Sequence, residues 1–339
     1  LAQILGLLNN KMARNVDVIV IGGGHAGVEA AWAASSVLPK STIAFVTMDR
    51  STIGVMSCNP AIGGLGKGQI VREIDALGGI MARAIDATGI MFKMLNTSKG
   101  PAVWGPRAQA DKDAYRDEVQ RLIATRANIE VIEATVDDFI VEDGEIKGVM
   151  LEEPLYAKAV VLTTGTFMRA LMHTGDSQEK GGRVGEGTAE GISKTLKKLD
   201  FELGRLKTGT PPRLSKKSID WDNLKPQLGD KNPTPFSDLP PSNFPQLKQV
   251  DCRITSTTEE MHQLIRDNLD RAPMYSGAID AESGPRYCPS IEDKVVRFED
   301  RTSHHVFLEP ETVKGDSIYC NGISTSLPKD IQEQIIPKM

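Results

Sequence analysis

The feature that most constrains the fold is a glycine-rich turn between a buried strand and a helix. Residues 16–21 read V-D-V-I-V-I, a β-branched run typical of a parallel strand buried on both faces. The turn Gly22-Gly23-Gly24-His25-Ala26-Gly27 follows directly. An alanine-rich stretch then predicts a helix to about Ser36, and residues 42–47 predict a second strand. The order is that of a βαβ unit with G-x-G-x-x-G at its first turn, the pattern of a dinucleotide-binding site.

The three motif glycines are expected to have different roles. Gly22 makes the tight turn, Gly24 lets a pyrophosphate approach the backbone, and Gly27 lets the helix and strand pack closely. The N-terminus of the helix, with its unpaired N–H groups, would face the phosphates. A turn that is merely tight is the alternative interpretation. An acidic residue usually binds the ribose about 20 residues further on. Here Asp49 follows the end of the second strand by two residues, so the ribose contact stays open.

Beyond the βαβ unit, the pattern predicts a long helix and several strands. Residues 111–126 have helical spacing, with Asp111 as a candidate N-cap. Residues 129–149 read as short strands that turn at Asp143-Gly144, a type I′ hairpin signal, and residues 159–163 read as a further buried strand. The helix face that we expect to be buried carries Tyr115, Val119, Leu122 and Ile123.

These elements predict an α/β fold, a Rossmann-type parallel sheet with a small antiparallel meander. FAD-binding domains are often elaborated in this way, which is an analogy at the level of the fold. Residues 204–273 are rich in proline and weakly periodic, and are expected to form an inserted α+β domain. The length of 339 residues also fits about two domains. We therefore assign residues 1–203 to the first part of the Rossmann-like domain and residues 274–339 to a return to it.

Charge and cysteine content bound the classes of function. The net charge is −5, so a nucleic-acid partner would need a local basic patch. No run of 18 apolar residues occurs, so we expect no membrane-spanning helix and no membrane partner. The four cysteines are too few and too widely spaced for a disulfide scaffold, and a reducing cytoplasm fits them best. Cysteines and histidines show no zinc-ligand spacing, so no metal is expected.

A local basic patch does occur between residues 194 and 217. The segment holds eight basic residues against only two acidic ones. A phosphate backbone is one partner for such a strip, and a solvated face is the other interpretation. The candidate nucleic-acid contacts are Lys194, Lys197, Lys198, Arg205, Lys207 and Arg213.

A second glycine-rich segment, residues 56–68, holds the first candidate catalytic residue. It superficially suggests a nucleotide triphosphate loop, but the pattern fails at Ala61 and at Gly68. Its four glycines would let backbone approach a flat ligand before a helix that begins near Gln69. Cys58 lies beside Asn59, in polar surroundings that could favour the thiolate. A small buried residue in a packed turn is the alternative interpretation.

A second cysteine, Cys288, lies beside Arg286 in the segment 284–294. It is 230 residues from Cys58, so only the fold can bring the two sulfurs together. No C-x-x-C or similar redox pair is present, which argues against a disulfide reductase.

These motifs together resemble the glucose-inhibited division protein A (MnmG) family of flavoenzymes. The matching segments run in order along nearly the whole chain. They read G-G-G-H-A-G at 22–27, M-S-C-N-P-A-I-G-G at 56–64, S-K-G-P-A-V at 98–103, R-L-K-T-G-T-P-P-R at 205–213, R-Y-C-P-S-I-E-D-K at 286–294 and N-G-I-S-T-S-L-P at 321–328. The family adds carboxymethylaminomethyl groups to carbon 5 of the wobble uridine of certain transfer RNAs.

The resemblance implies three small-molecule partners: FAD, NADH as reductant, and methylene-tetrahydrofolate as one-carbon donor. It implies a homodimer that binds tRNA and works with the MnmE GTPase in a heterotetramer. By position, FAD would contact residues 22–27 and Val136. A further flavin contact is usually serine, but Ala189 stands there, which puts that contact in doubt. The residues carried over for NAD are Gly284, Pro285, Arg286, Tyr287, Pro289, Ser290, Ile291, Glu292, Asp293, Lys294 and Phe298.

The chemistry of the family gives the two cysteines a role. Carbon 5 of uracil is a poor nucleophile until a group adds at carbon 6, and a thiolate is suited to that addition. We expect one of Cys58 and Cys288 to add to the base and the other to assist. Family members continue past residue 339 with a segment that completes the flavin site and a helical domain, so the chain resembles the N-terminal part. The alternatives are an inactive fragment that binds tRNA or dimerises, and a generic NADH:flavin oxidoreductase.

Overall fold

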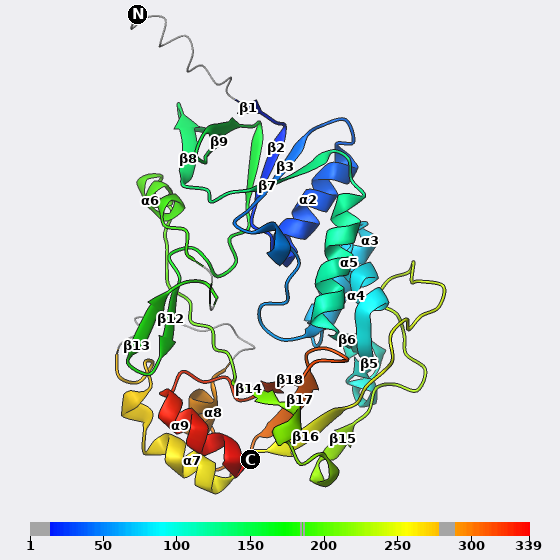
Figure 1. Cartoon of the computed structure of the whole chain (residues 1–339), viewed down its shortest axis with the longest axis vertical. Coiled ribbons are helices and arrows are strands. Elements are labelled where there is room, and N and C mark those ends of the chain that lie inside the picture. The colour runs from blue at the N-terminus through cyan, green and yellow to red at the C-terminus, as the bar shows by residue number, and fades with distance from the viewer. Residues whose placement is uncertain (1–13, 184, 186, 278–288) are drawn as a thin grey trace, which may run out of the picture.

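A four-stranded parallel sheet forms the centre of the upper body of the molecule (Figure 1). The structure is a computed structural model that describes residues 14–183, 185, 187–277 and 289–339. The strand order is β11 (Ala159–Leu162), β2 (Val18–Ile21), β3 (Ile43–Thr47) and β7 (Ile129–Glu133). All residues of β2 and β3 are buried, as their apolar runs predict. The Rossmann-type α/β class is thereby confirmed.

One face of this sheet is covered by α2 (His25–Val37) and α5 (Lys112–Ala124). The Asp111 side chain accepts a hydrogen bond of 3.1 Å from the backbone N–H of Ala114, which confirms the expected cap of α5. The apolar face of α5 that the spacing predicts is also confirmed. Its buried residues are Tyr115, Val119, Leu122 and Ile123.

The other face packs against α6 (Gly191–Lys198) and a small sheet that is antiparallel except for the parallel pairing of its first two strands. The order of that sheet is β1 (Arg14–Asn15), β10 (Pro154–Tyr156), β9 (Glu145–Met150) and β8 (Asp138–Glu142). Asp143 and Gly144 both have positive φ, 51° and 78°, which confirms the predicted type I′ turn between β8 and β9. This sheet is the expected meander.

Strand β11 is less buried than its apolar sequence predicts. It pairs with β2 over its whole length, but it is the edge strand of the described sheet. Ala159 and Val161 are exposed, Val161 by 37%. The prediction of a buried strand is therefore wrong in this respect, because an apolar run of four residues does not reveal whether a strand is central or at the edge.

A three-stranded antiparallel sheet and two helices extend the upper body. The sheet has the order β4 (Ala61–Gly63), β6 (Gly105–Ala110) and β5 (Gly89–Leu95), next to α3 (Lys67–Ala76) and α4 (Met81–Thr88). Helix α3 begins two residues before Gln69, the start expected from the sequence. Glu29 of α2 accepts hydrogen bonds from the backbone N–H groups of Ile80 and Met81, so a side chain of α2 caps α4.

The lower body is built on a five-stranded antiparallel sheet (Figure 1). Its order is β14 (Arg213–Ser215), β18 (Ser317–Asn321), β17 (His305–Pro310), β16 (Cys252–Ser256) and β15 (Lys225–Gln227). Helices α7 (Glu259–Arg266), α8 (Ile291–Arg297) and α9 (Lys329–Ile335) share one apolar core with it. This is an α+β arrangement. Its strands come from both sides of the expected boundary between residues 273 and 274.

The remaining segments connect the two bodies. The hairpin of β12 (Leu171–Thr174) and β13 (Ser177–Lys180) lies between them, and the N–H of Gly175 at its turn donates to the carbonyl of Ser326 at 2.8 Å. Single-turn helices complete the fold: η1 (Arg50–Thr52), η2 (Thr97–Lys99), η3 (Pro101–Val103), η4 (Lys216–Ser218), η5 (Trp221–Asn223), η6 (Leu269–Arg271) and η7 (Ile336–Lys338). Over the described residues, no helix has the length and apolar character needed to cross a membrane.

Candidate functional site

The glycine turn between β2 and α2 has the geometry that its sequence predicts. Gly22 has φ +108°, and a Cβ there would lie 2.2 Å from the carbonyl oxygen of Thr163. A Cβ on Gly27 would lie 1.8 Å from the carbonyl oxygen of Gly22. A Cβ on Gly24 would meet nothing within 4 Å. Two glycines are thus required by packing, whereas Gly24 borders open space at the helix N-terminus.

The first turn of α2 has no side-chain cap and no acidic residue, so it can accept an anion. Ala26 is exposed there. His25 instead packs against the ring of Tyr115, at 5.7 Å between ring centroids, and burial lowers the pKa of His25. Gly23 lies against the side chain of Thr47 at the end of β3.

The two positions carried over for flavin contacts follow β7 and β11, the two edge strands of the central sheet. Val136 follows β7 and is buried. Ala189 forms an isolated bridge with Met168, beyond β11. Asp49, the candidate ribose ligand, accepts a 2.7 Å hydrogen bond from the N–H of Ser51 and caps η1. This carboxylate therefore already has a partner within the protein.

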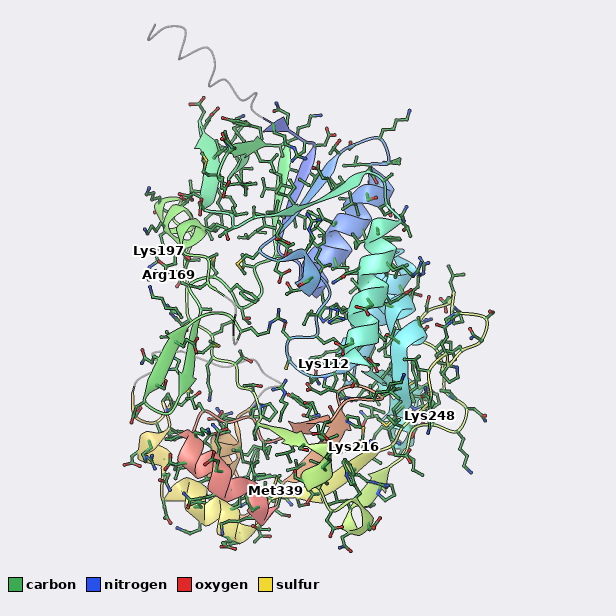
Figure 2. The ribbon with its side chains drawn as sticks, in the orientation of Figure 1. Lys112, Arg169, Lys197, Lys216, Lys248 and Met339 are labelled. Atoms are coloured by element: carbon green, nitrogen blue, oxygen red, sulfur yellow. The ribbon has the colours of Figure 1, made fainter. Side chains whose placement is uncertain are left out.

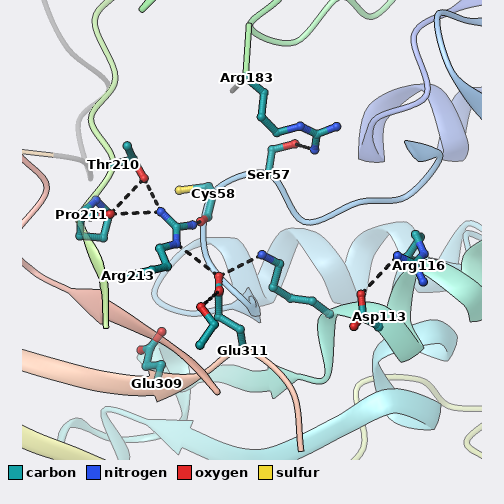
Figure 3. A network of polar contacts seen from close by, with 12 residues as sticks. Ser57, Cys58, Asp113, Arg116, Arg183, Thr210, Pro211, Arg213, Glu309 and Glu311 are labelled. Atoms are coloured by element: carbon teal, nitrogen blue, oxygen red, sulfur yellow. Dashed lines mark hydrogen bonds and ion pairs between the residues drawn. The ribbon is translucent and has the colours of Figure 1, made fainter. Parts of the chain in front are cut away.

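Cys58 lies in an exposed loop between the two bodies. Its carbonyl oxygen accepts a 3.1 Å hydrogen bond from Arg213 Nη2. The neighbouring Ser57 hydroxyl accepts one of 3.0 Å from Arg183 Nη1, and Figure 3 shows the two arginines reaching this loop from different segments. The guanidinium of Arg213 also lies over the ring of Tyr319 on β18, with 4.8 Å between the guanidinium carbon and the ring centroid.

A network of charges lies beneath this loop. Arg213 Nε is 3.5 Å from Glu311 Oε1, and Lys112 Nζ of α5 is 2.9 Å from the same oxygen (Figure 3). The Ser317 hydroxyl donates to Glu311 Oε2 at 2.6 Å. Burial raises the pKa of Glu311, but the contacts with Ser317, Lys112 and Arg213 outweigh it and the pKa is lowered. The network therefore fixes a charged carboxylate where α5 meets β14 and β18.

Glu309 of β17 has a set of contacts similar to that of Glu311. Arg107 Nη2 of β6 is 2.8 Å from Glu309 Oε1, and Asn321 Nδ2 donates to the same oxygen at 3.0 Å. The Glu309 side chain is 3% exposed. The two glutamates of the lower body are thus each paired with a cation of the upper body, Arg107 and Lys112, and these pairs hold the bodies together.

Sequence reasoning missed the residues that Arg213 connects to the Cys58 loop. Tyr319, Glu311 and Lys112 belong to segments that are far from residue 58 in sequence, and no local pattern singles them out. Arg213 stands out in the sequence as one charge of the basic strip and as the end of the motif at 205–213, but neither pattern connects it to Cys58. The tyrosine beside a buried cysteine in β18 reads as an ordinary core strand.

The second candidate cysteine, Cys288, lies outside the described residues. The four residues before it that are carried over for NAD lie outside them as well: Gly284, Pro285, Arg286 and Tyr287.

The rest of the segment carried over for NAD begins α8. Ser290 and Asp293 cap this helix reciprocally, and Ile291 is fully buried. Glu292 is buried and accepts hydrogen bonds from the Thr325 hydroxyl and the Ser326 N–H. The remaining positions differ in exposure: Pro289 and Phe298 are exposed, and Lys294 donates to the carbonyl oxygen of Gly322.

The basic residues expected to bind nucleic acid divide into two groups. Lys194, Lys197 and Lys198 are exposed on α6, and Arg205 is exposed near Arg169. Figure 2 shows Lys197 and Arg169 on the α6 side, away from Lys112 and Lys216. The other two belong to the region between the bodies: Lys207 is 91% buried and lies 3.8 Å from Asp293 Oδ2, and Arg213 is in the Glu311 network.

The described residues hold no group of three or more His, Cys, Asp or Glu side chains placed to bind a metal ion. The buried thiols of Cys252 and Cys320 have pKa values raised to about 12 by burial. They are thus poor nucleophiles at neutral pH. Among the described cysteines, Cys58 alone is exposed.

A sequence profile of the family described as "Glucose inhibited division protein A" matches residues 17–339. The chain is 53% identical over 328 residues to the tRNA uridine 5-carboxymethylaminomethyl modification enzyme MnmG of Granulibacter bethesdensis, covering 95% of this chain and 51% of that protein. It is 54% identical over 338 residues to the enzyme of the same name from Rhodopirellula baltica, covering 96% and 51%. The chain thus spans about half the length of these curated relatives.

Solved structures give the same result. Aquifex aeolicus GidA in the form I crystal superimposes with a TM-score of 0.88 at 48% identity, covering 95% of this chain and 54% of that one. The form II crystal gives a TM-score of 0.86 at 46% identity, covering 95% and 52%. The similarity therefore extends over nearly all of this chain and over both of its bodies.

Proposed function

The chain belongs to the glucose inhibited division protein A family, and we propose that it is the N-terminal, flavin-binding part of an enzyme that modifies the wobble uridine of tRNA. The family assignment confirms the resemblance seen in the sequence motifs. The activity is inferred from relatives whose printed name is tRNA uridine 5-carboxymethylaminomethyl modification enzyme. Because the chain spans about half of those relatives, substrates and partners of the whole protein are part of the proposal.

We propose that FAD binds at the glycine turn between β2 and α2. The residues fit a pyrophosphate: Gly24 borders open space, and the first turn of α2 carries neither a cap nor an acidic side chain. The packed glycines Gly22 and Gly27 hold the turn against Thr163. Bound FAD would supply hydride transfer or carry the one-carbon unit. The protein's part is to fix the pyrophosphate at this helix N-terminus.

The further cofactors and partners of the proposal are those that the family resemblance implies. NADH would act as reductant at residues 284–298, and methylene-tetrahydrofolate would supply the one-carbon unit. The working unit would be a cytoplasmic homodimer with the MnmE GTPase. For tRNA, the exposed lysines of α6 are the favoured surface, because they lie free of the ion pairs that engage Lys207 and Arg213.

Cys58 is the described residue best suited to attack the base. Its thiolate would form an S–C6 bond with uracil, while the C5=C6 electron pair moves toward O4 and makes carbon 5 nucleophilic. After carbon 5 has reacted and lost its proton, elimination of the thiolate restores the double bond. Cys288 would assist, as its place in the family motif implies.

The observation that carries this proposal is the exposed Cys58 in a loop fixed by Arg213 and Arg183. The test is Cys58→Ala, with bound flavin and tRNA modification measured separately and the matched variant Cys252→Ala as control. We expect Cys58→Ala to keep its flavin and lose modification by at least about 100-fold, as expected for a nucleophile. Full modification in Cys58→Ala would refute the role. Flavin bands in the purified chain would exclude an inert fragment. NADH turnover that rises when tRNA is added would exclude a generic oxidoreductase.

A further inference from the structure

The guanidinium of Arg213 has a partner at each of its three nitrogen atoms. Nε lies 3.5 Å from Glu311 Oε1. Nη1 donates hydrogen bonds of 2.5 Å to the Thr210 hydroxyl and of 3.2 Å to the carbonyl oxygen of Pro211. Nη2 donates to the carbonyl oxygen of Cys58 at 3.1 Å (Figure 3). Because the guanidinium is planar and rigid, these contacts together fix both its position and its orientation.

The residues around this guanidinium are themselves anchored in the lower body. Strands β14 and β18 pair so that Arg213 lies directly opposite Tyr319, and the guanidinium carbon is 4.8 Å from the centre of that ring. The carbonyl oxygen of Thr210 accepts a 3.3 Å hydrogen bond from the N–H of Thr325. The side chain that reaches Cys58 is therefore attached firmly to the lower body, although Cys58 belongs to the upper one.

Cys58 stands between two arginine contacts. Arg213 holds its carbonyl oxygen, and Arg183 Nη1 donates to the hydroxyl of the preceding Ser57 at 3.0 Å. The two arginines reach the loop from different segments (Figure 3). When the backbone of a residue is held, rotation about χ1 among three staggered positions is the main freedom left to its side chain. The contact at the carbonyl therefore helps to decide where the sulfur lies.

Arg213 is also one of the basic residues that the sequence suggests as nucleic-acid contacts, so two roles compete. Its side chain is 31% exposed, but its donors are directed at oxygen atoms of the protein. A phosphate would have to displace one of these partners. Lys197 on α6 is exposed and lies away from this region (Figure 2). The contacts of Arg213 thus favour a role within the protein.

The geometry points to Arg213 as the positioning residue of Cys58: it holds the Cys58 carbonyl from the lower body and so fixes the direction from which the sulfur meets the base. This inference deepens the proposed function and rests on it for its use in catalysis. Arg213 forms no bond to the substrate and transfers no proton. It keeps the sulfur within reach of carbon 6, where a displacement of about 1 Å can cost about 100-fold in rate.

The first test measures the restraint of the backbone at Cys58 and needs no enzyme activity. A nitroxide spin label is attached to Cys58 in the 339-residue chain that carries Cys288→Ser. The other two thiols, Cys252 and Cys320, are buried and stay unlabelled. The EPR spectrum of the label then reports how strongly the loop is held.

Arg213→Lys keeps the positive charge but has a single donor nitrogen, which cannot hold the Cys58 carbonyl and Glu311 together. We expect the restrained component of the label spectrum to be lost. Glu311→Gln keeps the arginine and removes the charge that holds its Nε, so the restrained component should decrease. This second variant gives the reading if Arg213→Lys does not fold. Arg266→Lys, which changes a surface arginine of α7, is the matched control and should leave the spectrum unchanged.

The second test separates positioning from tRNA binding. Arg213→Lys should lower kcat for tRNA modification by about 10- to 100-fold and leave KM for tRNA unchanged, as expected when only the alignment of the nucleophile is lost. A phosphate contact would give the opposite result, with KM raised, kcat unchanged and the salt dependence of binding weakened. Lys197→Gln, on the α6 surface proposed for tRNA, provides the comparison for that pattern.

An unchanged label spectrum in both folded variants would overturn the inference, and so would a raised KM with unchanged kcat in Arg213→Lys. The proposed function fails separately. If the label is released in Arg213→Lys while Cys58→Ala still modifies tRNA, Arg213 does position the loop and the nucleophile is another residue.

Discussion

The guanidinium of Arg213 on β14 stacks over the ring of Tyr319 on β18, with 4.8 Å between the guanidinium carbon and the ring centre. The same side chain also lies 3.5 Å from Glu311 and donates to the Cys58 carbonyl. One planar cation therefore makes a ring contact, an ion pair and a backbone hydrogen bond. Lysine has the charge but lacks the planar fork that makes all three possible.

We therefore expect Arg213→Lys to lower the free energy of unfolding by about 1–2 kcal/mol, the sum of a lost hydrogen bond and a weakened cation–π contact. Urea unfolding measures this loss. Arg266→Lys is the matched control, because Arg266 pairs with Glu259 on the exposed surface and its replacement should cost about 0.5 kcal/mol or less. Equal losses in the two variants would show that the Arg213 contacts add nothing beyond a surface ion pair.

A second prediction concerns Asp86 at the joint between α4 and the proline-rich loop. Its carboxylate is fully buried and accepts 2.8 Å hydrogen bonds from the N–H groups of Phe236 and Ser237. Burial raises the pKa of Asp86 to about 6, although both hydrogen bonds oppose the rise. Since the folded pKa lies above the unfolded value of 3.8, the folded state binds the proton more tightly.

The stability contribution of Asp86 is therefore full below pH 3.8 and is lost as the pH rises through about 6. Asp86→Asn does not titrate, so its urea midpoint should fall less than that of the unaltered chain between pH 4.5 and pH 6.5. Asp238→Asn changes an exposed acid in the same loop, and its urea midpoint should fall with pH as steeply as that of the unaltered chain. Parallel pH profiles for the unaltered chain and Asp86→Asn would contradict the assignment.

Local sequence patterns predicted the elements that depend on neighbouring residues. The turn at Gly22–Gly27, the apolar face of α5 and the positive φ angles at Asp143-Gly144 each follow from a few adjacent residues whose steric and periodic requirements are strong. Such signals are independent of how distant segments pack. They were sufficient for the α/β class and for the candidate FAD turn.

The contacts that define the Cys58 site could not be predicted in this way. Lys112, Arg213 and Glu311 meet only because α5, β14 and the segment after β17 converge in space. The lower sheet likewise joins strands from residues 213–256 with strands from residues 305–321. No periodicity within either segment records the pairing, because register between distant strands is set by the folded core.

A third prediction follows from two neighbouring histidines of the lower body, of which His262 is fully buried. His262 Nε2 lies 2.7 Å from the Thr257 hydroxyl, and the rings of His262 and His304 are 5.3 Å apart. Burial lowers the pKa of both imidazoles, and His262 lowers the pKa of His304 further. Because the folded pKa values lie below the unfolded value of 6.5, the neutral imidazoles contribute stability above pH 6.5. This contribution is lost as the pH falls through the folded pKa values.

The unaltered chain should accordingly lose stability on acidification from pH 7.5 to pH 5. His262→Gln should cost about 1–3 kcal/mol at pH 7.5 through its lost contacts and should show a smaller loss on acidification. His305→Gln, at the exposed start of β17, should change neither the stability at pH 7.5 nor its loss on acidification. Thermal unfolding at the two pH values distinguishes these outcomes, and an undiminished acid loss in His262→Gln would place the sensitivity elsewhere.

The last prediction separates the packing role of the glycine turn from its binding role. Gly24→Ala adds a Cβ with nothing within 4 Å, at a φ of −74° that alanine adopts without strain. Gly27→Ala adds one that would lie 1.8 Å from the Gly22 carbonyl oxygen. We expect Gly24→Ala to unfold within about 0.5 kcal/mol of the unaltered chain and Gly27→Ala to lose about 3 kcal/mol or more.

Flavin content should follow a different order. The Cβ of Gly24→Ala would occupy the space through which the pyrophosphate approaches, so its flavin absorbance should fall at least about tenfold although the fold is intact. Absorbance of the purified variants, set beside their urea unfolding curves, provides both readings. Full flavin occupancy in a stable Gly24→Ala protein would show that the pyrophosphate does not lie against this backbone, and the FAD proposal at α2 would have to be abandoned.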